Sequence, residues 1–583
     1  METLAKEKME KLNQQKIRVT GSEALLLSLI AEEVTTIFGY PGGAIMPVYD
    51  KLYDFKDRLK HILTRHEQGA VHAAQGYARV SGRTGVCFAT SGPGATNLIT
   101  GIVDAYMDST PIVCVTGQVG SHLIGSDAFQ ETDVVGISMP VTKWNYQVTK
   151  AEEIPEAMAK AFYIAKSGRP GPVLVDITKD AMLQEMDFAY EPCTYIRSYV
   201  PMPHIKEEQL NRAAEMINEA KKPFALIGQG VILGGAENEL LAFLEKSGIP
   251  AAFTLLGLSA LPNDHPQHMG MLGMHGHAAP NIMTNECDLL IGIGMRFDDR
   301  VTGKVSKYAT QAKILHFELD KAEINKIIKV DAYVNGNVKE TLPAVTAKLV
   351  KKSFEGWINE FKIIRKDEEK RVIHPELYPE GNKISMGEVM RVINEAVKGE
   401  AVLVTDVGQH QMMASRYFNF KNTRSWITSG GLGTMGFGLP AAMGAQFGAP
   451  DKTVIMVAGD GGFQMTLQEL GTIAYNRLPV KMIVLNNNFL GMVRQWQELF
   501  FEERYSSTPI SSPNYPILAS AYGIAGETVK DRTDLKAAIA RMLETDGPYL
   551  LEVKVINKGN VFPMIPQGAA VNEVLYGDEK SSK

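Results

Sequence analysis

Apolar runs of strand length alternate with amphipathic helical patterns in the first part of the chain. The apolar runs occupy residues 34–40, 84–91, 110–117 and 171–178. Helical patterns lie between them, at residues 68–82 and 152–168. Strands that alternate with helices predict a parallel, doubly wound α/β sheet. Gly-rich turns after the strands predict binding loops at the carboxyl edge of that sheet.

The same alternation occurs twice more, so we expect three doubly wound parallel-sheet domains in series. After a helix near 207–220, further apolar runs occupy 223–230, 249–256, 287–297, 312–320, 401–408, 453–462, 480–487 and 549–556. A Pro-containing segment, 191–204, is typical of a linker, and the charged segment 351–380 predicts an exposed helix and connector. The expected parts are an N-terminal tail 1–17, domains 18–190, 205–350 and 385–556, a connector 351–384 and a C-terminal tail 557–583.

Composition is that of an ordinary soluble enzyme. Of the 583 residues, 45% are hydrophobic and 22% are charged, and the formal net charge is -6. No global field therefore attracts the chain to nucleic acid or to an anionic membrane. The uncharged stretch from Ser429 to Ala449 could span a bilayer by length, but it holds seven glycines and Pro440. We expect a loop followed by a fully buried helix there.

The cysteines and the N-terminus indicate a cytoplasmic, reducing location. Cys87, Cys114, Cys193 and Cys287 form no CxxC pair and lie in or beside apolar runs. Buried reduced thiols are therefore expected rather than a disulfide framework or a zinc site. The first residues mix acidic and basic side chains and have no apolar leader segment.

One motif in the third block predicts a metal and diphosphate site. Gly459-Asp460-Gly461 follows an apolar run, and Asn486-Asn487 ends the next run after 24 intervening residues. Two strand ends thus present a carboxylate and an amide oxygen, which are hard ligands that suit Mg²⁺. The glycines permit close approach of backbone N–H groups to phosphate. A lone GDG would be weak, but GDG with NN at this spacing is typical of thiamine-diphosphate enzymes.

Glu67 is a second candidate. It stands at the start of an apolar helical pattern, after a short predicted strand. By itself, a carboxylate there could simply be stabilised by the helix dipole. Beside the GDG…NN motif, the functional interpretation is favoured, because these enzymes need one carboxylate to hold a proton on the cofactor's pyrimidine ring.

Several further motifs make the chain, from about Arg18 to Leu575, resemble the biosynthetic, FAD-containing acetolactate synthase (acetohydroxyacid synthase) family. They occupy residues 39–50, 65–82, 91–97, 127–131, 296–303, 431–442, 490–497 and 563–566. The resemblance implies pyrimidine-binding, FAD-binding Rossmann-like and diphosphate-binding domains, in that order. It implies a transferase that uses thiamine diphosphate, Mg²⁺ and a structural FAD.

The implied reaction joins two 2-keto acids in isoleucine and valine biosynthesis. Pyruvate is decarboxylated, and its hydroxyethyl unit is transferred to pyruvate, giving 2-acetolactate, or to 2-ketobutyrate, giving 2-aceto-2-hydroxybutyrate. The implied assembly is a homodimer or dimer of dimers, with a small regulatory subunit as a further partner.

The resemblance also implies roles for individual residues. The implied catalytic and substrate-binding residues are Gly42, Glu67, Phe129, Gln130, Lys179, Met274, Arg300 and Trp496. The implied thiamine diphosphate contacts are Pro41, Glu67, Val407, Gly408, Gln409, His410, Gly433, Met435, Gly459, Asp460, Gly461, Gly462, Asn487, Phe489, Leu490, Gly491 and Met492. The metal ligands are expected to be Asp460, Asn487 and the carbonyl of Phe489. The implied FAD contacts are Arg169, Gly228, Gln229, Gly230, Thr254, Leu255, Leu256, Gly273, Met274, His275, Gly294, Arg296, Asp298, Arg300, Glu318, Asp320, Asn337, Val338, Gly430 and Gly431.

Each of these roles has a plainer alternative. Arg300 could form a structural ion pair with Asp298 or Asp299, and Trp496 and Met435 could be packing residues. The GxG at 228–230 is weak by itself. Four positions differ from the family's usual pattern: Trp144, Thr178, Asn337 and Met413.

Three other functions compete with a carboligase that forms acetolactate. One is a sister enzyme, such as pyruvate oxidase or glyoxylate carboligase. Another is an oxidoreductase in which the flavin does the chemistry. The third is a non-catalytic homologue, against which intact Glu67, Asp460 and Asn487 argue.

Overall fold

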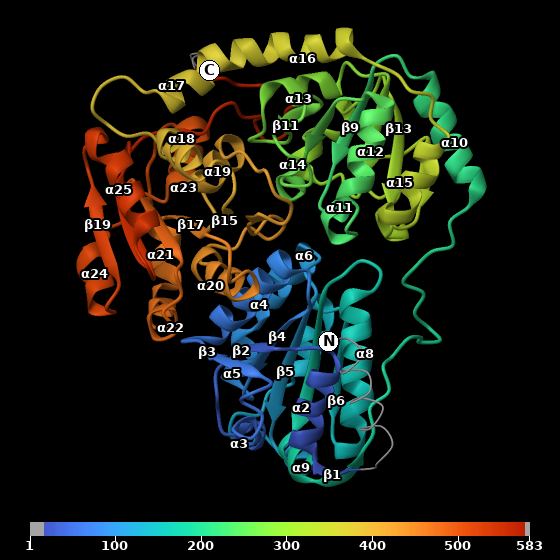
Figure 1. The fold of residues 1–583 in the computed structure, drawn as a ribbon, viewed down its shortest axis with the longest axis vertical. Coiled ribbons are helices and arrows are strands. Elements are labelled where there is room, and N and C mark those ends of the chain that lie inside the picture. The colour runs from blue at the N-terminus through green and yellow to red at the C-terminus, as the bar shows by residue number, and fades with distance from the viewer. Residues whose placement is uncertain (1–16, 578–583) are drawn as a thin grey trace. The chain divides into compact units, whose positions relative to one another are not determined.

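The computed structural model describes residues 17–577, so the expected N-terminal tail 1–17 lies outside the described residues except for its last position (Figure 1). The described chain forms two compact units. The first contains residues up to Pro201 together with Ser429–Asp451 and Thr466–Leu478, and the second contains Met202–Thr428, Lys452–Met465 and residues from Pro479 onward.

The first unit is built on a parallel six-stranded sheet. Its strand order is β3 (Lys60–Leu63), β2 (Thr36–Gly39), β4 (Gly85–Ala89), β5 (Ile112–Gln118), β7 (Pro172–Thr178) and β6 (Trp144–Val148). The antiparallel pair β1 (Ile17–Thr20) and β8 (Glu185–Phe188) accompanies it. Its helices are α2 (Gly21–Ala31), α3 (Met46–Leu52), α4 (Glu67–Ser81), α5 (Pro93–Asn97), α6 (Ile99–Met107), α7 (Val134–Ser138), α8 (Ile154–Lys166), α9 (Lys179–Leu183), α20 (Gly438–Gly448) and α22 (Leu470–Tyr475).

The second unit contains two further parallel six-stranded sheets. The central one has the order β11 (His268–Met271), β10 (Ala251–Phe253), β9 (Pro223–Ile227), β12 (Leu289–Ile293), β13 (Lys313–Glu318), β14 (Ala332–Asn335). The other has the order β16 (Trp426–Ile427), β15 (Val402–Thr405), β17 (Val454–Gly459), β18 (Lys481–Asn486), β20 (Tyr549–Lys554), β19 (Ala525–Val529). The predicted fold class, three parallel α/β sheets with helices, is confirmed.

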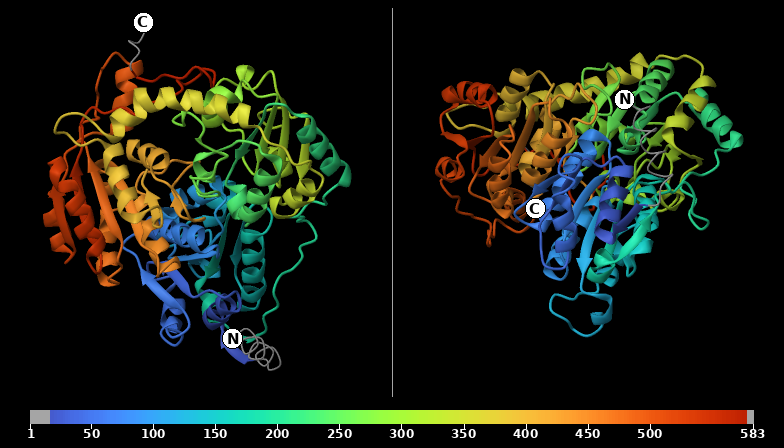
Figure 2. Two further views of the ribbon diagram at one scale, coloured as in Figure 1. Left: turned by 45° about the horizontal axis from the view of Figure 1, so that its top comes forward. Right: turned by 60° about the horizontal axis from the view of Figure 1, so that its bottom comes forward.

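Helices surround both sheets of the second unit, as the two further views also show (Figure 2). They are α10 (Glu207–Glu219), α11 (Gly230–Leu233), α12 (Glu237–Ser247), α13 (Ala278–Thr284), α14 (Asp299–Thr302), α15 (Val338–Ala347), α16 (Glu355–Glu368), η7 (Glu369–Ile373), α17 (His374–Leu377), α18 (Met386–Val397), α19 (Gln409–Tyr417), α21 (Asp460–Met465), α23 (Gly491–Phe500), α24 (Tyr515–Ala521) and α25 (Arg532–Glu544). In β9, Ala225 and Ile227 enter one buried cluster while Phe224 and Leu226 enter another. Since successive side chains of a strand point to opposite faces, both faces of the central sheet are covered.

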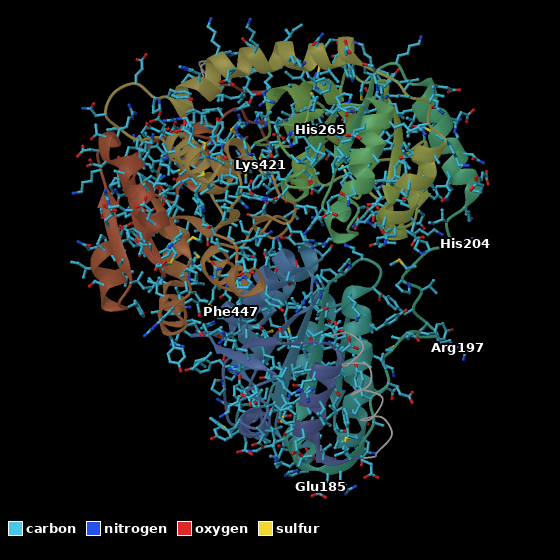
Figure 3. The ribbon with its side chains drawn as sticks, in the orientation of Figure 1. Glu185, Arg197, His204, His265, Lys421 and Phe447 are labelled. Carbon is cyan, nitrogen blue, oxygen red and sulfur yellow. The ribbon has the colours of Figure 1, made fainter. Side chains whose placement is uncertain are left out.

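The uncharged stretch from Ser429 to Ala449 forms a loop and then the buried helix α20, as predicted. A Cβ on Gly76 of α4 or on Gly444 of α20 would come closer than 3.0 Å to the other helix's backbone. The glycines therefore let α4 and α20 pack in backbone contact. Phe447, near the end of α20, is labelled in Figure 3, and the Lys60 ammonium lies 4.8 Å from its ring centre. Among the described residues, no helix has both the length and the apolar character needed to cross a membrane.

Two predictions need correction. The charged segment 351–380 was expected to be an exposed helix, but α16 buries Trp357, Phe361 and Glu368. The segment is highly charged on average, so its composition does not reveal the one apolar face that the helix buries. All four cysteines are free, and three are buried as predicted, but Cys193 is only half-buried. It lies on the predicted linker segment, where Figure 3 labels Arg197 and His204.

Candidate active site

Asp460 and Asn487 meet at the carboxyl edge of the third sheet. Strands β17 and β18 are parallel neighbours in which Gly459 lies opposite Leu485. Asp460 directly follows β17, and Asn487 directly follows β18. The backbone N–H of Asn488 donates to Asp460 Oδ2 over 3.0 Å, which joins the two strand ends directly. The two loops that carry Asp460 and Asn487 are therefore in direct contact.

The carboxylate of Asp460 is suited to a cation. Asp460 is only 1% exposed, and burial raises the pKa of its carboxyl to about 6. Ser512 Oγ donates to its Oδ2 over 3.2 Å. No ion pair within the described residues 17–577 includes Asp460. A buried carboxylate that has no cationic side chain as a partner, on a loop in contact with the Asn487–Asn488 segment, is an oxygen donor that fits Mg²⁺.

Glycines allow three loops to approach one another at this edge. A Cβ at Gly462 would lie closer than 3.0 Å to Asp406 Oδ1. A Cβ at Gly491 would likewise lie closer than 3.0 Å to the side-chain oxygen of Gln409 and to the side-chain nitrogen of Asn487. Glycine at these positions therefore leaves room for the side chains of Asp406, Gln409 and Asn487, which a Cβ would force to shift.

Gln409 and His410 open helix α19 at the point where the strand order reverses. In the third sheet β15 lies between β16 and β17, and such a switch point is where open α/β sheets bind ligands. Gln409 Nε2 donates to Gln495 Oε1 over 2.9 Å. His410 is buried, burial lowers the pKa of its imidazole to about 4, and its Nε2 has no partner among the described residues. An unpartnered buried imidazole beside glycine-rich strand ends fits a bound diphosphate.

The predicted diphosphate contacts of the second unit therefore share one sheet edge. They are Val407, Gly408, Gln409 and His410 after β15, Gly459, Asp460, Gly461 and Gly462 at β17, and Asn487, Phe489, Leu490, Gly491 and Met492 after β18.

Glu67 occupies the corresponding edge of the first unit. It is the first residue of α4, directly after the β3 loop, and is 8% exposed. The side-chain amide of Asn97 donates to its Oε2 over 3.0 Å. A Cβ on Gly42 or Gly94 would come closer than 3.0 Å to Thr90. The β4 loop thus contacts the Glu67 carboxylate through Asn97 and packs against Gly42 of the β2 loop at Thr90.

The loop that carries Gly433 and Met435, both at least partly exposed, is held by two aspartates of the first unit. Thr434 Oγ1 donates to Asp104 Oδ1 over 2.7 Å. The backbone N–H groups of Gly430 and Gly431 donate to Asp108 over 2.9 and 2.6 Å. These two glycines, which the resemblance assigns to FAD, already have N–H partners here.

Arg300 lies beside a pocket of about 240 Å³ in the second unit. The backbone N–H of Met274 donates to the Arg300 carbonyl over 2.8 Å, and Arg300 Nη1 lies 3.5 Å from Met274 Sδ. The lining residues are Met274, Asp299, Arg300, Gly303, Ile565, Pro566, Gln567 and Gly568. The contact of Arg300 with Asp299 is long, at 3.7 Å, and both side chains are largely exposed. This arrangement favours a ligand role for the guanidinium over a structural ion pair.

The other predicted substrate-binding residues lie outside this pocket. Phe129 and Lys179 are exposed in the first unit, and Phe129 is 88% exposed. Gln130 packs against Gly92, so it lies near the end of β4. Trp496 lies on α23, with its ring 5.0 Å from that of Phe500, and it does not line the Arg300 pocket.

The predicted FAD residues of the second unit gather around the central sheet. Its strand order corresponds to 3-2-1-4-5-6, the order of dinucleotide-binding folds. Gly228 and Gly230 follow β9, and Gly294 follows β12, so all three lie at the switch point. Their loops pack on each other, since the N–H of Gly230 donates to the Gly294 carbonyl over 2.8 Å.

Some of the predicted FAD side chains around the central sheet already have hydrogen-bond partners within the protein, and others do not. Thr254, Asp298, Asp320 and Asn337 each cap a helix or turn. His275 is half-buried, and its buried Nδ1 has no partner among the described residues. Gln229, Leu255, Leu256, Gly273, Arg296, Glu318 and Val338 lie in the same loops and strand ends. Arg169 belongs to the first unit, where its Nε donates to Ser109 Oγ over 2.9 Å.

Sequence reasoning missed several residues that hold the site. They are Asn97, which contacts Glu67, Ser512, which contacts Asp460, Gln495, which contacts Gln409, and Asp104 and Asp108. Asn97 and Gln495 lie inside motifs that carried the resemblance. The sequence therefore placed them near the site, but it gave no signal that they contact Glu67 and Gln409.

Comparison with known proteins agrees with this arrangement. Models of the thiamine pyrophosphate enzyme family match as the N-terminal TPP binding domain at residues 19–137, the central domain at 210–345 and the C-terminal TPP binding domain at 406–553. The chain is 47% identical over 559 residues to the acetolactate synthase isozyme 2 large subunit of Escherichia coli, covering 96% of this chain and 99% of that protein. It is 46% identical to the acetolactate synthase large subunit of Corynebacterium glutamicum, over 96% and 90% of the two chains. It is 44% identical to that of Lactococcus lactis, over 95% and 96%. This chain therefore belongs to the acetolactate synthase large-subunit family of thiamine pyrophosphate enzymes.

Proposed function

We propose that this chain decarboxylates pyruvate and transfers the resulting two-carbon unit to a second 2-keto acid. Pyruvate as acceptor gives 2-acetolactate, and 2-ketobutyrate gives 2-aceto-2-hydroxybutyrate, both precursors of branched-chain amino acids. The observation that carries the proposal is the bond between the Asn488 N–H and Asp460, which brings the GDG and NN segments together beside His410.

Asp460, Asn487 and the Phe489 carbonyl would hold Mg²⁺, and the glycine-rich strand ends with Gln409 and His410 would hold the diphosphate. Thiamine diphosphate supplies the electron sink that decarboxylation of a 2-keto acid needs. The protein's part is to fix the cofactor's two ends and to exclude water.

Glu67 would hold a proton at the pyrimidine ring nitrogen of the cofactor. Its burial and its bond from Asn97 keep the carboxylate in one orientation, as proton transfer at a fixed atom requires. Met435 would support the bent form of the cofactor.

Arg300 would bind the carboxylate of the acceptor keto acid with its planar guanidinium. The aliphatic and thioether wall from Met274 and Ile565 would accept the short alkyl chain. Phe129, Gln130, Lys179 and Trp496 would complete the site, with Trp496 favouring the ethyl group of 2-ketobutyrate. The 88% exposure of Phe129 supports an assembly in which a second copy of the chain covers it, either a homodimer or a dimer of dimers.

FAD would bind the central sheet in a structural role, because the proposed reaction involves no net oxidation. The strand order of the central sheet and the unpartnered Nδ1 of His275 support FAD binding. The side-chain oxygen of Asn337 already accepts a hydrogen bond as the N-cap of α15, which leaves it less free to bind the flavin. A small regulatory subunit is the further proposed partner.

Product analysis tests the proposal. The purified chain is incubated with pyruvate while thiamine diphosphate, Mg²⁺ and FAD are each omitted in turn. We expect 2-acetolactate, and its loss when either of the first two is absent. Acetate or acetyl phosphate with CO2 would instead place the chain with the pyruvate oxidases. Bleaching of bound flavin by pyruvate would indicate a flavin oxidoreductase. If no product forms even with an added regulatory subunit, the chain is a non-catalytic homologue.

A further inference from the structure

Arg416 and Glu368 form a buried ion pair in the second unit. Arg416 Nη2 lies 2.7 Å from Glu368 Oε1, and both side chains are 0% exposed. Arg416 lies in the last turn of α19, and Glu368 is the last residue of α16. The ion pair is therefore fully shielded from solvent.

Arg416 Nη1 and Glu368 Oε2 bind one short backbone segment. Arg416 Nη1 donates to the carbonyl of Gly276 over 2.8 Å and to the carbonyl of His275 over 3.3 Å. Glu368 Oε2 accepts the backbone N–H of Ala278 over 2.8 Å. The two side chains therefore clamp residues 275–278 from both sides.

That segment is continuous with Met274, which lines the Arg300 pocket. The Met274 N–H donates to the Arg300 carbonyl over 2.8 Å, and the Met274 carbonyl accepts the Ile565 N–H over 2.8 Å. Gly273 just before it has a φ of +105°, a conformation that favours glycine. Met274 thus stands between a left-handed glycine and the clamped residues, so its position depends on the clamp.

Stability alone does not account for a pair of this kind. A buried ion pair loses hydration on both partners, and apolar side chains of similar volume often serve the fold equally well. Burial lowers the pKa of His275 to about 4, so this residue is neutral near pH 7 and adds no second positive charge beside Arg416. What charged groups offer over apolar ones here is directional hydrogen bonding to the backbone of 275–278.

We infer that Arg416 and Glu368 are positioning residues that fix Met274 against Arg300 and so shape the acceptor pocket. Helix α19 begins with Gln409 and His410 at the proposed diphosphate edge and carries Arg416 in its last turn. Through helix α19, the clamp therefore also sets the distance between the proposed diphosphate edge and the Arg300 pocket. The identity of the ligand as a 2-keto acid rests on the proposed function, but the positioning of Met274 does not.

The test uses the full-length double variant Glu368→Leu/Arg416→Met, which removes both charges at similar volume. Glu360→Gln is the matched control, because Glu360 lies on the same helix in an exposed pair with Lys222. We expect the 2-ketobutyrate concentration for half-maximal product to rise about tenfold in the double variant, with the thiamine diphosphate Kd within about twofold of wild type. The control should match wild type in both quantities.

Hydrogen exchange of the amides of 274–278, measured by mass spectrometry, gives a readout independent of turnover. We expect these amides to exchange at least about tenfold faster in the double variant than in the control. Unchanged exchange, or faster exchange with unchanged acceptor half-saturation, overturns the inference. If the double variant does not fold, Glu368→Gln replaces it, and the same two outcomes apply. If the wild-type chain makes no acetolactate, the proposed function fails, and hydrogen exchange alone decides the positioning of Met274.

Discussion

The side-chain amide of Asn97 donates a 3.0 Å hydrogen bond to the carboxylate of Glu67. Glu67 follows β3 and Asn97 ends α5 after β4, so the bond joins two loops at one edge of the first sheet. A Cβ on Gly94 would stand 3.3 Å from Glu67 Oε1, so the backbone of Gly94 lies close to the other carboxylate oxygen. The carboxylate is therefore held in a single orientation before any cofactor binds.

Removing this bond should slow turnover. Asn97→Ala leaves the Glu67 carboxylate without its donor, and a hydrogen bond to a charged group contributes about 1.5–3 kcal/mol. We expect kcat for acetolactate formation to fall about tenfold, with little change in the thermal midpoint. Thr96→Ala is the control, since its exposed hydroxyl bonds only the Pro93 carbonyl. Equal kcat values in the two variants would show that Asn97 does not orient Glu67.

A methyl group at Gly491 should weaken cofactor binding. Gly491→Ala places a Cβ closer than 3.0 Å to the side chains of Gln409 and Asn487, so both must move. We expect the Kd for thiamine diphosphate with Mg²⁺, measured by fluorescence quenching, to rise at least about tenfold. Gly356→Ala, in helix α16 with open space around its Cβ, should leave the Kd unchanged and stabilise the helix by up to about 1 kcal/mol. A wild-type Kd in Gly491→Ala would refute this account of the loops.

Glu469 should make stability depend on pH. It is buried and accepts the N–H of Arg65 just before α4, and burial raises the pKa of its carboxyl from 4.5 to about 7. The folded state therefore binds more protons than the unfolded state between those values, so stability falls as pH rises through this window and levels off above about pH 7.

Glu469→Gln removes this contribution while it keeps an acceptor for the Arg65 N–H. We expect its thermal midpoint, relative to wild type, to improve between about pH 5 and pH 8. Glu156→Gln is the control, because Glu156 is exposed on α8. An identical pH profile for Glu469→Gln and wild type would show that the carboxyl is not protonated on folding.

Trp496 should set the choice of acceptor. One methylene group in an apolar pocket changes the free energy of discrimination between substrates by about 1–3 kcal/mol. In a mixture of both acceptors, Trp496→Leu should therefore lower the ratio of 2-aceto-2-hydroxybutyrate to 2-acetolactate by up to about tenfold. The ratio is measured by chromatography of the products. Phe501→Leu, on an exposed neighbour beyond α23, should keep the wild-type ratio. A shift of similar size in both variants would assign the preference to the helix as a whole.

The sequence pattern predicts the interior strands well and the sheet edges poorly. Strands such as β5, β9 and β17 are buried on both faces and appear as continuous apolar runs. The missed strands β6, β11, β14, β16 and β19 all lie at the edges of the six-stranded sheets, and the missed strands β1 and β8 form the separate two-stranded sheet. Several of them are short or partly exposed, so no apolar run marks them.

The same reasoning explains which site residues could be predicted. Asp460 and Asn487 end consecutive strands that are also neighbours in the sheet, so their convergence follows from local order. Asp104 reaches Thr434 across 330 positions, and Ser512 reaches Asp460 across 52. Such partners depend on how distant segments pack, which periodicity and spacing do not encode.

The proton-holding role of Glu67 is the central claim, and Glu67→Gln tests it most directly. The measurement is kcat for acetolactate from saturating pyruvate, with thiamine diphosphate and Mg²⁺ in excess and cofactor binding checked separately. General acid–base assistance contributes about 10²–10⁴-fold, so we predict that kcat falls by at least about a hundredfold in a variant that still binds the cofactor. A kcat within about twofold of wild type would contradict the account.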